Sequence, residues 1–229
     1  MYKSLCFVLS CLLIGCTESV TVSKQLADMP SIVPDYNGVT IPSEIAPLNF
    51  AVKEAGKGVQ VRFSNGRDSF EVEANDGSVI IPTGKWKQLL FSAKGKQITV
   101  RVFVKQSEGW VAYAPFLMNV ASEPIDPYIV YRLIDPGYEL WNQMGIYQRE
   151  LASYDQSAIY ENKMTENNCV NCHSFCMQNP EKMLFHMRET YPGTILIDGE
   201  KIEKLNTKTP KTISPLVYPS WHPSGRYIA

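Results

Sequence analysis

The sequence predicts a mainly β protein, and three observations support this fold class. Between Ile45 and Val120, apolar and polar residues alternate with a period of two, as they do in half-buried strands. Asn-Gly, Asp-Gly and Lys-Gly pairs divide these runs at intervals of roughly ten residues. The chain also contains 15 prolines and 14 glycines, which favour short strands and loops over long helices. We therefore expect an antiparallel, immunoglobulin-like β-sandwich over residues 41–124.

Alternating or apolar runs mark the strands expected within this sandwich. They are Val59–Phe63, Phe70–Glu73, Val79–Ile81, Gln97–Val104 and Trp110–Tyr113. Asn65-Gly66 and Asp76-Gly77 supply turn signals between consecutive runs. The region contains no histidine and no cysteine, so we expect it to support or space the rest of the chain.

Composition and charge fit a globular protein of one or two domains. The chain has 229 residues, of which 45% are hydrophobic and 20% are charged. Its 22 basic and 23 acidic residues give a formal net charge of -1, and no basic block is present. The sequence therefore offers nothing for nucleic-acid binding. No Ser-His-Asp set or carboxylate pair is specific enough to indicate an enzyme.

The N-terminal segment predicts export and attachment to a membrane. Lys3 precedes an apolar run, Leu5–Ile14, that is too short to cross a bilayer. The following Gly15-Cys16 completes a resemblance to the bacterial lipobox, which implies cleavage before Cys16 and acylation of its thiol. An ordinary secretory signal or a short anchor is the alternative.

This N-terminal resemblance sets the expected location of the mature protein. Residues 1–15 would be a lipoprotein signal peptide and residues 16–40 a polar tether. Several acyl chains on Cys16 would anchor the protein stably, where a single chain would not. We therefore expect a lipid-anchored protein on the extracytoplasmic side of the bacterial envelope, at the outer membrane.

One motif carries most of the functional information. Cys169, Cys172 and His173 form C-x-x-C-H, the attachment pattern of c-type haem. Two thiols at this spacing reach the two vinyl groups of one porphyrin, and the next histidine binds the iron as proximal ligand. Export agrees with this interpretation, because bacteria attach c-type haem outside the cytoplasm. We therefore expect one haem c, used for electron transfer with a redox protein partner or for redox or ligand sensing.

A short helix after the motif is expected to supply the sixth iron ligand. Asn179-Pro180 predicts its start, because asparagine caps helices well and proline suits the first helical position. Met183, His186 and Met187 would share one face of this helix. His186 is the first candidate for the distal ligand, and the two methionines are alternatives. Less favoured candidates are Met164 and Met177, and an iron without a sixth protein ligand remains open.

Cys176 leaves a second interpretation open. With Cys169, Cys172 and either His173 or His186, it would complete a zinc site with three thiolates and one imidazole. The cysteines also suit an iron–sulfur cluster with one other ligand, or a redox-active C-x-x-C pair. If the cysteines bind zinc or remain thiols, the chain would be a non-redox envelope interaction protein.

The region 125–192 is expected to be a connector that holds the haem segment. A helix is predicted where apolar residues recur with helical spacing, interrupted by Gly145, at Tyr138, Trp141, Ile146 and Leu151. The aromatic residues of this region would form either a packed core or an apolar wall for a porphyrin.

The last segment, 193–229, predicts a hairpin followed by the start of a propeller blade. Asp198-Gly199 is the turn signal of the hairpin. The stretch Tyr218–Ala229 resembles the blade motif of TolB-like propellers, which implies a turn at His222–Gly225 and an inner strand at Arg226–Ala229. His222 is therefore expected to be a turn residue. A propeller needs about four to eight blades, so we expect a truncated propeller.

Taken together, the lipobox, the β region, CVNCHSF and YPSWHPSG resemble a family of Bacteroidetes TolB-like or WD-repeat-like propeller lipoproteins. The resemblance covers nearly the whole chain. It implies a lipid anchor at Cys16, haem attachment at Cys169 and Cys172, and a propeller that begins near the C-terminal end. The chain departs from the family pattern because it holds only one blade motif.

Overall fold

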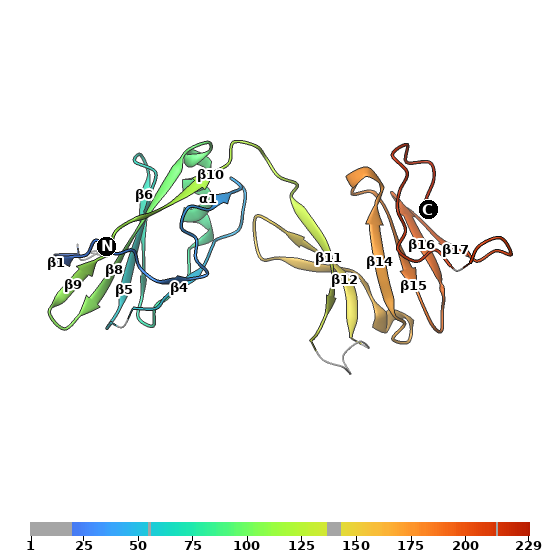
Figure 1. Cartoon of the computed structure of the whole chain (residues 1–229), viewed down its shortest axis with the longest axis horizontal. Helices are drawn as coiled ribbons and strands as arrows, with labels where there is room; N and C mark the ends of the chain where they lie inside the picture. Colours follow the sequence, from blue (N-terminus) through green and yellow to red (C-terminus); the bar gives the residue numbers. More distant parts are fainter. Residues whose placement is uncertain (1–19, 55, 137–142, 214) are drawn as a thin grey trace, which may run out of the picture. The chain divides into compact units, whose positions relative to one another are not determined.

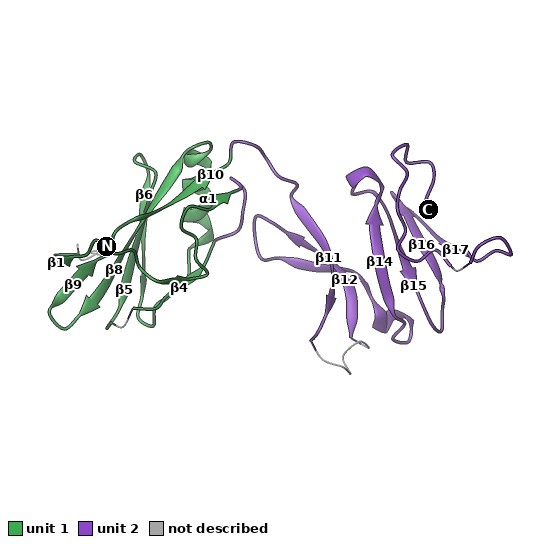
Figure 2. Cartoon of the chain, viewed as in Figure 1, with its two compact units in different colours: residues 1–41, 48–121 green, residues 42–47, 122–229 purple. Residues whose placement is uncertain are grey.

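The structure, a computed structural model, describes residues 20–54, 56–136, 143–213 and 215–229. It is mainly β, as the sequence predicts, and its described residues form one α-helix. The chain divides into two compact units (Figure 2). The described parts of unit 1 lie within residues 20–41 and 48–121, and unit 2 comprises residues 42–47 and 122–229. The expected connector and C-terminal segment therefore belong to the same unit.

Unit 1 contains a seven-stranded sheet and a three-stranded sheet (Figure 1). The strands of the larger sheet are β1 (Val22–Gln25), β3 (Thr40–Ile41), β5 (Val59–Ser64), β6 (Ser69–Ala74), β8 (Gln97–Gln106), β9 (Gly109–Ala112) and β10 (Phe116–Val120). Those of the smaller sheet are β2 (Ile32–Val33), β4 (Phe50–Val52) and β7 (Ser78–Val79). The long strand β8 organises the larger sheet, because β5, β9 and β10 all pair with it in antiparallel orientation.

Most strands predicted in this unit are confirmed. The runs at 59–63, 70–73, 97–104 and 110–113 correspond to β5, β6, β8 and β9. The run at 79–81 contributes only Val79 to β7. Alternation predicted these strands well because one face of each packs on the core, where Phe63 and Val100 are fully buried.

The helix α1 spans Thr83–Ala93 between β7 and β8 and was not predicted from the sequence. Its buried residues recur at helical spacing, at Trp86, Leu89, Leu90 and Ala93. This period of 3.6 was visible in the sequence, but it stands among strands with a period of two. Trp86 packs edge-on against Phe63, with ring centroids 6.0 Å apart, so the helix closes the core of unit 1.

The tether expected over residues 16–40 is wrong from Val22 onwards. Val22–Gln25 forms β1, which pairs with β9 in parallel orientation, and Ile32–Val33 forms β2, which pairs with β4. Ile32 is buried, and the pairing with β9 and β4 provides hydrogen-bond partners for the backbones of β1 and β2. The strand β1 has no apolar period because it is exposed along its whole length, and β2 is too short, at two residues, to show one.

Unit 2 is built from two antiparallel sheets whose strands follow one another in chain order. The three-stranded sheet consists of β11 (Tyr128–Ile134), β12 (Met144–Glu150) and β13 (Gln156–Glu161). The four-stranded sheet consists of β14 (Val170–Phe175), β15 (Lys182–Met187), β16 (Gly193–Asp198) and β17 (Lys201–Leu205). Two short 3-10 turns, η2 (Asn162–Thr165) and η3 (Cys176–Gln178), flank β14.

Two helices predicted in unit 2 are wrong where the structure describes them. Met144–Glu150, within the first predicted helix, is the central strand β12, while Tyr138 and Trp141 lie outside the described residues. The second predicted helix, after Asn179-Pro180, is the strand β15. Pairing with β14 on one side and β16 on the other satisfies its backbone in place of helical hydrogen bonds.

The two sheets of unit 2 share one hydrophobic core. Its buried members are Met144, Ile146, Tyr160, Val170, Met183, Phe185 and Met187. The ring centroids of Tyr160 and Phe185 lie 5.1 Å apart across this core. Because strand side chains alternate, every second residue of β15 enters the core, and this positions the strand that carries the predicted distal ligands.

Both C-terminal turns are confirmed. The hairpin of β16 and β17 turns at Asp198-Gly199, where Asp198 pairs with Lys201. In the second turn the Gly225 N–H donates to the His222 carbonyl over 2.8 Å, and Trp221 bridges to Ile228. His222 is therefore a turn residue, as the sequence predicts. The Trp221 Nε1–H donates to the Ser174 carbonyl over 3.2 Å, which holds this turn against β14.

Candidate functional site

The C-x-x-C-H motif lies at the start of β14 and in an irregularity within it. Asn171 pairs with His186 and Ser174 pairs with Leu184, so Cys172 and His173 together face the single residue Phe185. This arrangement is a β-bulge, which redirects side chains at the point of insertion. Cys172 has a φ of 58°, in the left-handed region that residues other than glycine seldom adopt.

Left-handed backbone conformations concentrate around the motif. Among the described residues other than glycine, positive φ occurs at Glu166, Asn167, Cys172, Met177, Gln178, Glu189 and Tyr218. All of them belong to unit 2, and most lie between residues 166 and 178. Such conformations persist only where the surrounding structure enforces them, and they are common at functional sites. The backbone therefore marks the motif segment independently of its sequence.

The two motif thiols are partly accessible and free. Cys169 and Cys172 are half-buried, whereas Cys176 is buried, and none of the three forms a disulfide. The Cys169 carbonyl accepts a hydrogen bond from the Arg188 N–H over 2.9 Å, which fixes the backbone where β14 begins. Both motif sulfurs therefore remain available for covalent chemistry.

Arg188 brings a positive charge to the two thiols, and sequence reasoning missed it as a site residue. Burial acts to lower the pKa of its guanidinium, but a hydrogen bond to Tyr218 and the nearby Cys172 and Cys169 raise the pKa overall. Arg188 follows β15, and Tyr218 comes from the C-terminal segment. No local pattern could have joined two residues so far apart in the sequence.

His173 is half-buried, and its ring has a defined partner. Burial lowers the pKa of His173 from its usual value, and the charge of Arg132 lowers it further. A hydrogen bond between the ring and the backbone of Val130 opposes this shift. When one ring nitrogen donates to a carbonyl, the other remains an acceptor, which is the usual arrangement of a histidine that binds a metal.

The expected distal ligands do not share one face, which corrects the helical prediction. On the strand β15, Met183 and Met187 point into the core between the two sheets, where they are 4% and 3% exposed. His186 lies on the opposite face of β15, is 2% exposed, and its Nδ1 is 3.1 Å from the Thr194 hydroxyl oxygen. Burial and the charge of Arg188 lower the pKa of His186.

The less favoured methionines are the exposed ones. Met164, in η2, is 70% exposed, and Met177, in η3, is 59% exposed. Their exposure could not be read from the sequence, because both lie in short 3-10 turns with no periodic pattern. Of the methionines considered as iron ligands, only these two present their thioethers to solvent.

Cys176 is separated from solvent by the C-terminal turn. A Cβ atom added at Gly225 would lie 3.1 Å from the Cys176 sulfur, so the backbone of this turn lies directly on the thiol.

Within the described part of the chain, no group of three or more His, Cys, Asp or Glu side chains is arranged to hold a metal ion.

The predicted lipidation site, Cys16, lies outside the described residues. Among the residues that the structure does describe, none of the helices is both long and apolar enough to cross a membrane.

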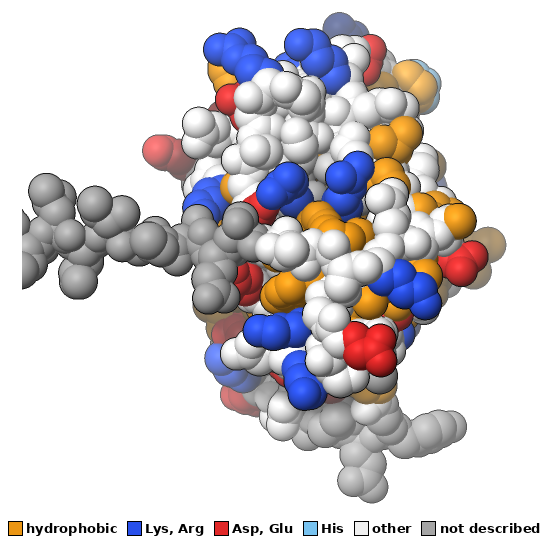
Figure 3. All heavy atoms as spheres, turned by 90° about the vertical axis from the view of Figure 1, so that its left-hand side faces the viewer, with side chains coloured by type: hydrophobic (Ala, Val, Ile, Leu, Met, Phe, Trp, Pro, Cys, Tyr) orange, Lys and Arg blue, Asp and Glu red, His pale blue; other side chains and the backbone are white. Residues whose placement is uncertain are grey.

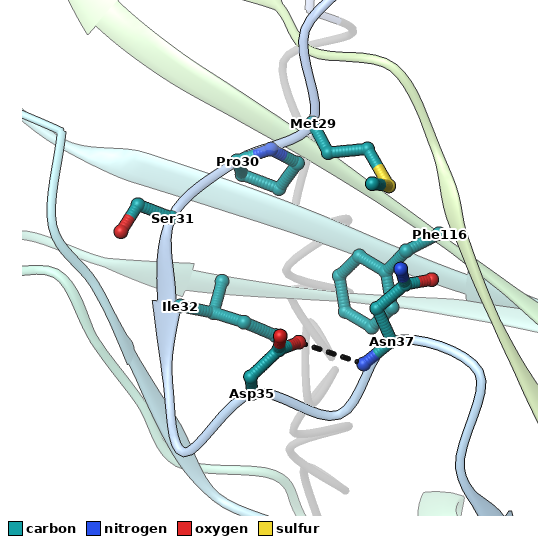
Figure 4. Close-up of a pocket in the computed structure, with 7 residues that line it drawn as sticks. All are labelled: Met29, Pro30, Ser31, Ile32, Asp35, Asn37 and Phe116. Carbon is teal, nitrogen blue, oxygen red and sulfur yellow. Dashed lines mark hydrogen bonds between the residues drawn. The ribbon is translucent and has the colours of Figure 1, made fainter.

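Unit 1 contains a small hollow near its N-terminal strands. It has a volume of about 130 Å³ and is lined in part by Met29, Asp35, Asn37 and Phe116 (Figure 4). The Asp35 carboxylate accepts a hydrogen bond from the Asn37 N–H over 2.9 Å, so this polar group already stabilises the local turn. The hollow therefore offers little unsatisfied polar chemistry for a ligand.

Comparison with known proteins gives no match, either to a protein-family model or to a curated protein.

Proposed function

We propose that this chain is an envelope lipoprotein that carries one covalently attached haem c, used for electron transfer or for redox or ligand sensing. Cys169 and Cys172 would hold the porphyrin, His173 would bind the iron, and Cys16 would carry the lipid anchor. The observation that carries the proposal is the pair of free, partly exposed thiols, one just before β14 and one in its bulge, followed by a histidine with a backbone partner. When bound, the haem would supply a one-electron iron couple.

The residues around the motif fit haem attachment. Both thiols are accessible, the ring of His173 is oriented by Val130, and the αL conformation of Cys172 sets the directions of two adjacent motif side chains. Arg188 adds a cation beside the thiols, which favours an anionic group at this position. The chain's own residues would therefore orient the group and balance its charge.

The residues of β15 are less suited to serve as the sixth iron ligand than the sequence predicts. His186, Met183 and Met187 would each have to leave a buried position, and His186 would lose its hydrogen bond to Thr194. We therefore rank the exposed thioethers of Met164 and Met177 above them. On this proposal, His186→Gln leaves the absorption spectrum of the haem protein unchanged, whereas a change in the iron bands would return His186 to first place.

We also propose that unit 2 is the beginning of a β-propeller and that unit 1 is a variant of the expected immunoglobulin-like sandwich. An antiparallel four-stranded sheet whose strands follow chain order is the usual form of a propeller blade. The β14–β17 sheet has this form and shares a core with the β11–β13 sheet. The turn at His222–Gly225 would open the next blade, so the motif cysteines would lie within a blade rather than in a separate connector.

Covalent haem attachment is testable directly. The full chain is expressed together with the cytochrome c maturation machinery, denatured on a gel and stained for haem. We expect a stained band for the wild type and for Cys176→Ala, and no band for Cys169→Ala combined with Cys172→Ala. Cys176→Ala is the matched control, because it removes the third thiol of the segment without touching the motif.

The same preparation tests the alternative of a non-redox interaction protein. A colourless wild-type chain whose three thiols react freely, or which releases zinc on denaturation, would overturn the haem proposal in favour of that alternative. Mass spectrometry of the mature N-terminus in its native host separately reports whether Cys16 is acylated.

A further inference from the structure

The outward face of α1 is basic and carries a large aromatic side chain. Phe91 is 85% exposed, although phenylalanine is usually buried. Lys87 precedes it by four residues and Gln88 by three, so these side chains lie on the same face of the helix, and Lys85 is exposed one turn before Gln88. The helix contains no acidic residue. This face therefore combines positive charge with exposed apolar surface.

A cleft beside the helix adds a further cation. The turn between β5 and β6 is joined to α1 by a hydrogen bond of 2.7 Å from the Asn65 amide to the Ser92 hydroxyl. Between turn and helix lies an open cleft of about 540 Å³. Its lining includes Arg67, Asp68, Phe70, Lys85, Gln88 and Leu89. We call Arg67, Lys85, Lys87, Gln88 and Phe91 together the α1 basic face.

No ion pair among the described residues neutralises the cations of the α1 basic face. The ion pairs formed among the described residues do not include Arg67, Lys85 or Lys87, whereas Arg62, nearby on β5, pairs with Glu71 over 2.5 Å. Asp68 is the one carboxylate in the lining of the cleft. The face shown in Figure 3 differs, because Lys and Arg side chains there are interspersed with Asp and Glu.

We propose that the α1 basic face is a membrane-contact surface that binds the headgroups of anionic phospholipids. Lysine and arginine side chains interact with the phosphates of such a surface, and an exposed phenylalanine enters the boundary between headgroups and acyl chains. The aliphatic parts of Lys85 and Lys87 allow their ammonium groups to reach the phosphates while the helix lies along the surface. The inference rests on the proposed lipid anchor, which would bring unit 1 close to a membrane.

The experiment measures binding of the lipid-free mature chain, residues 16–229 with Cys16→Ser, to vesicles. Phosphatidylethanolamine vesicles containing phosphatidylglycerol are compared with neutral phosphatidylcholine vesicles by co-sedimentation. We expect binding to the anionic vesicles only, and weaker binding as salt rises. Because each cation near such a surface contributes a factor of about five, Lys85→Gln combined with Lys87→Gln should lower partitioning at least about tenfold.

Two further variants test whether vesicle binding depends on the position of the lysines and on the exposed ring of Phe91. Lys208→Gln combined with Lys211→Gln removes the same charge from exposed positions in unit 2, and should lower partitioning less than about twofold. Phe91→Ser keeps every charge and should lower partitioning about fivefold by removing the inserted ring. Circular dichroism confirms that each variant remains folded.

Equal losses for the two lysine pairs, or equal binding to neutral and anionic vesicles, would overturn the inference. So would a complete absence of vesicle binding, which would leave the α1 basic face to a protein partner. Because the chain tested has no acyl group, its vesicle binding does not depend on the anchor. Acylated native protein without vesicle binding refutes the surface alone, whereas vesicle binding without acylation refutes the anchor alone.

Discussion

Unit 1 and unit 2 are both built from short strands, but they differ in where the backbone takes up left-handed conformations. In unit 1, the described residues with positive φ are all glycines at turns or strand starts, such as Gly38 and Gly66. In unit 2, described residues other than glycine adopt the same conformations, Cys172 among them. Unit 1 therefore follows ordinary turn chemistry, whereas unit 2 holds strained residues around the cysteine motif.

The cores of the two units differ in a corresponding way. Unit 1 is closed by a contiguous aromatic group in which Phe63 stacks on Phe70 at 5.0 Å and meets Phe50 at 6.4 Å. Unit 2 buries His186, Met183 and Met187 on β15 and Met144 on β12, whereas Met118 is the buried methionine among the described residues of unit 1. Among the described residues, every histidine and cysteine lies in unit 2, so the side chains suited to metal or redox chemistry gather there, whereas the core of unit 1 serves stability.

The largest expected effect tests the core of unit 1. Phe63→Ala removes a fully buried ring from this aromatic group and should lower the free energy of unfolding of unit 1 by about 3–5 kcal/mol. Urea titration followed by hydrogen exchange would measure the loss in each unit. Phe91→Ala, at an 85% exposed position, should change stability by less than about 0.5 kcal/mol. Similar losses for both variants would contradict the assignment of the core.

A smaller effect tests the buried polar pair of unit 2. Thr194→Val keeps the shape of a fully buried side chain but removes the hydroxyl that partners His186. Leaving the imidazole without this partner should cost about 1–3 kcal/mol at pH 8. Ser92→Ala, which removes a half-buried hydroxyl in unit 1, provides the comparison, and an equal or larger loss there would refute the prediction.

His186 should also make the free energy of unfolding depend on pH. Burial lowers the pKa of His186 in the folded chain, so below the unfolded value of about 6.5 the unfolded chain binds more protons than the folded chain. Its contribution to stability is therefore complete above about pH 6.5 and is lost as the pH falls towards the folded pKa. Urea titrations at several pH values between 5 and 8 should show this fall before haem attachment. His186→Gln should reduce the slope, and an unchanged slope would contradict the prediction.

Substituting one turn glycine in each unit compares the steric constraints on the two turns. Gly38 and Gly225 both have left-handed φ, but only Gly225 has a neighbour in the way, the Cys176 sulfur. Gly38→Ala should cost about 1 kcal/mol from φ alone, and Gly225→Ala should cost about 2 kcal/mol because the new methyl group also presses on Cys176. Thermal unfolding measures both, and equal costs would mean that the turn moves away from the thiol without penalty.

The smallest expected change in stability concerns the backbone strain at Cys172. Cys172→Gly should stabilise the haem-free chain by about 0.5–1 kcal/mol, because glycine adopts a φ of 58° without steric cost. Cys169→Gly should not stabilise it, since Cys169 has no left-handed φ. Chemical denaturation of the two variants provides the measurement. A destabilised Cys172→Gly would show that the bulge is not strained by its side chain.

Much of unit 1 could be predicted because its signals are local. The alternation of Val59–Phe63 requires only that one face of the strand be buried, and the Asn65-Gly66 pair specifies the turn that follows. The helix α1 was missed although its apolar spacing was visible, and β1 was missed because an exposed strand has no apolar period. The strand predictions therefore succeeded where burial was one-sided.

The candidate site was predicted in its chemistry but not in its arrangement. C-x-x-C-H identified Cys169, Cys172 and His173, whereas the helix expected to follow it is the strand β15. Met183 and Met187 have a spacing that suits one face of a helix and also one face of a strand, so periodicity alone could not decide. Pairing with two neighbouring strands decided it, and this separated His186 from both methionines.

The amino-acid sequence by itself determined the β character of the chain, the two C-terminal turns and the position of the cysteine motif, because each depends on residues close together in the chain. Only the tertiary structure decided which sulfurs are exposed, which face of β15 carries His186, and that Arg188 and Tyr218 meet beside the thiols. These features depend on strand pairing and packing between residues far apart in sequence. A local pattern carries no record of such contacts, since the free energy that selects them arises only when the sheets assemble.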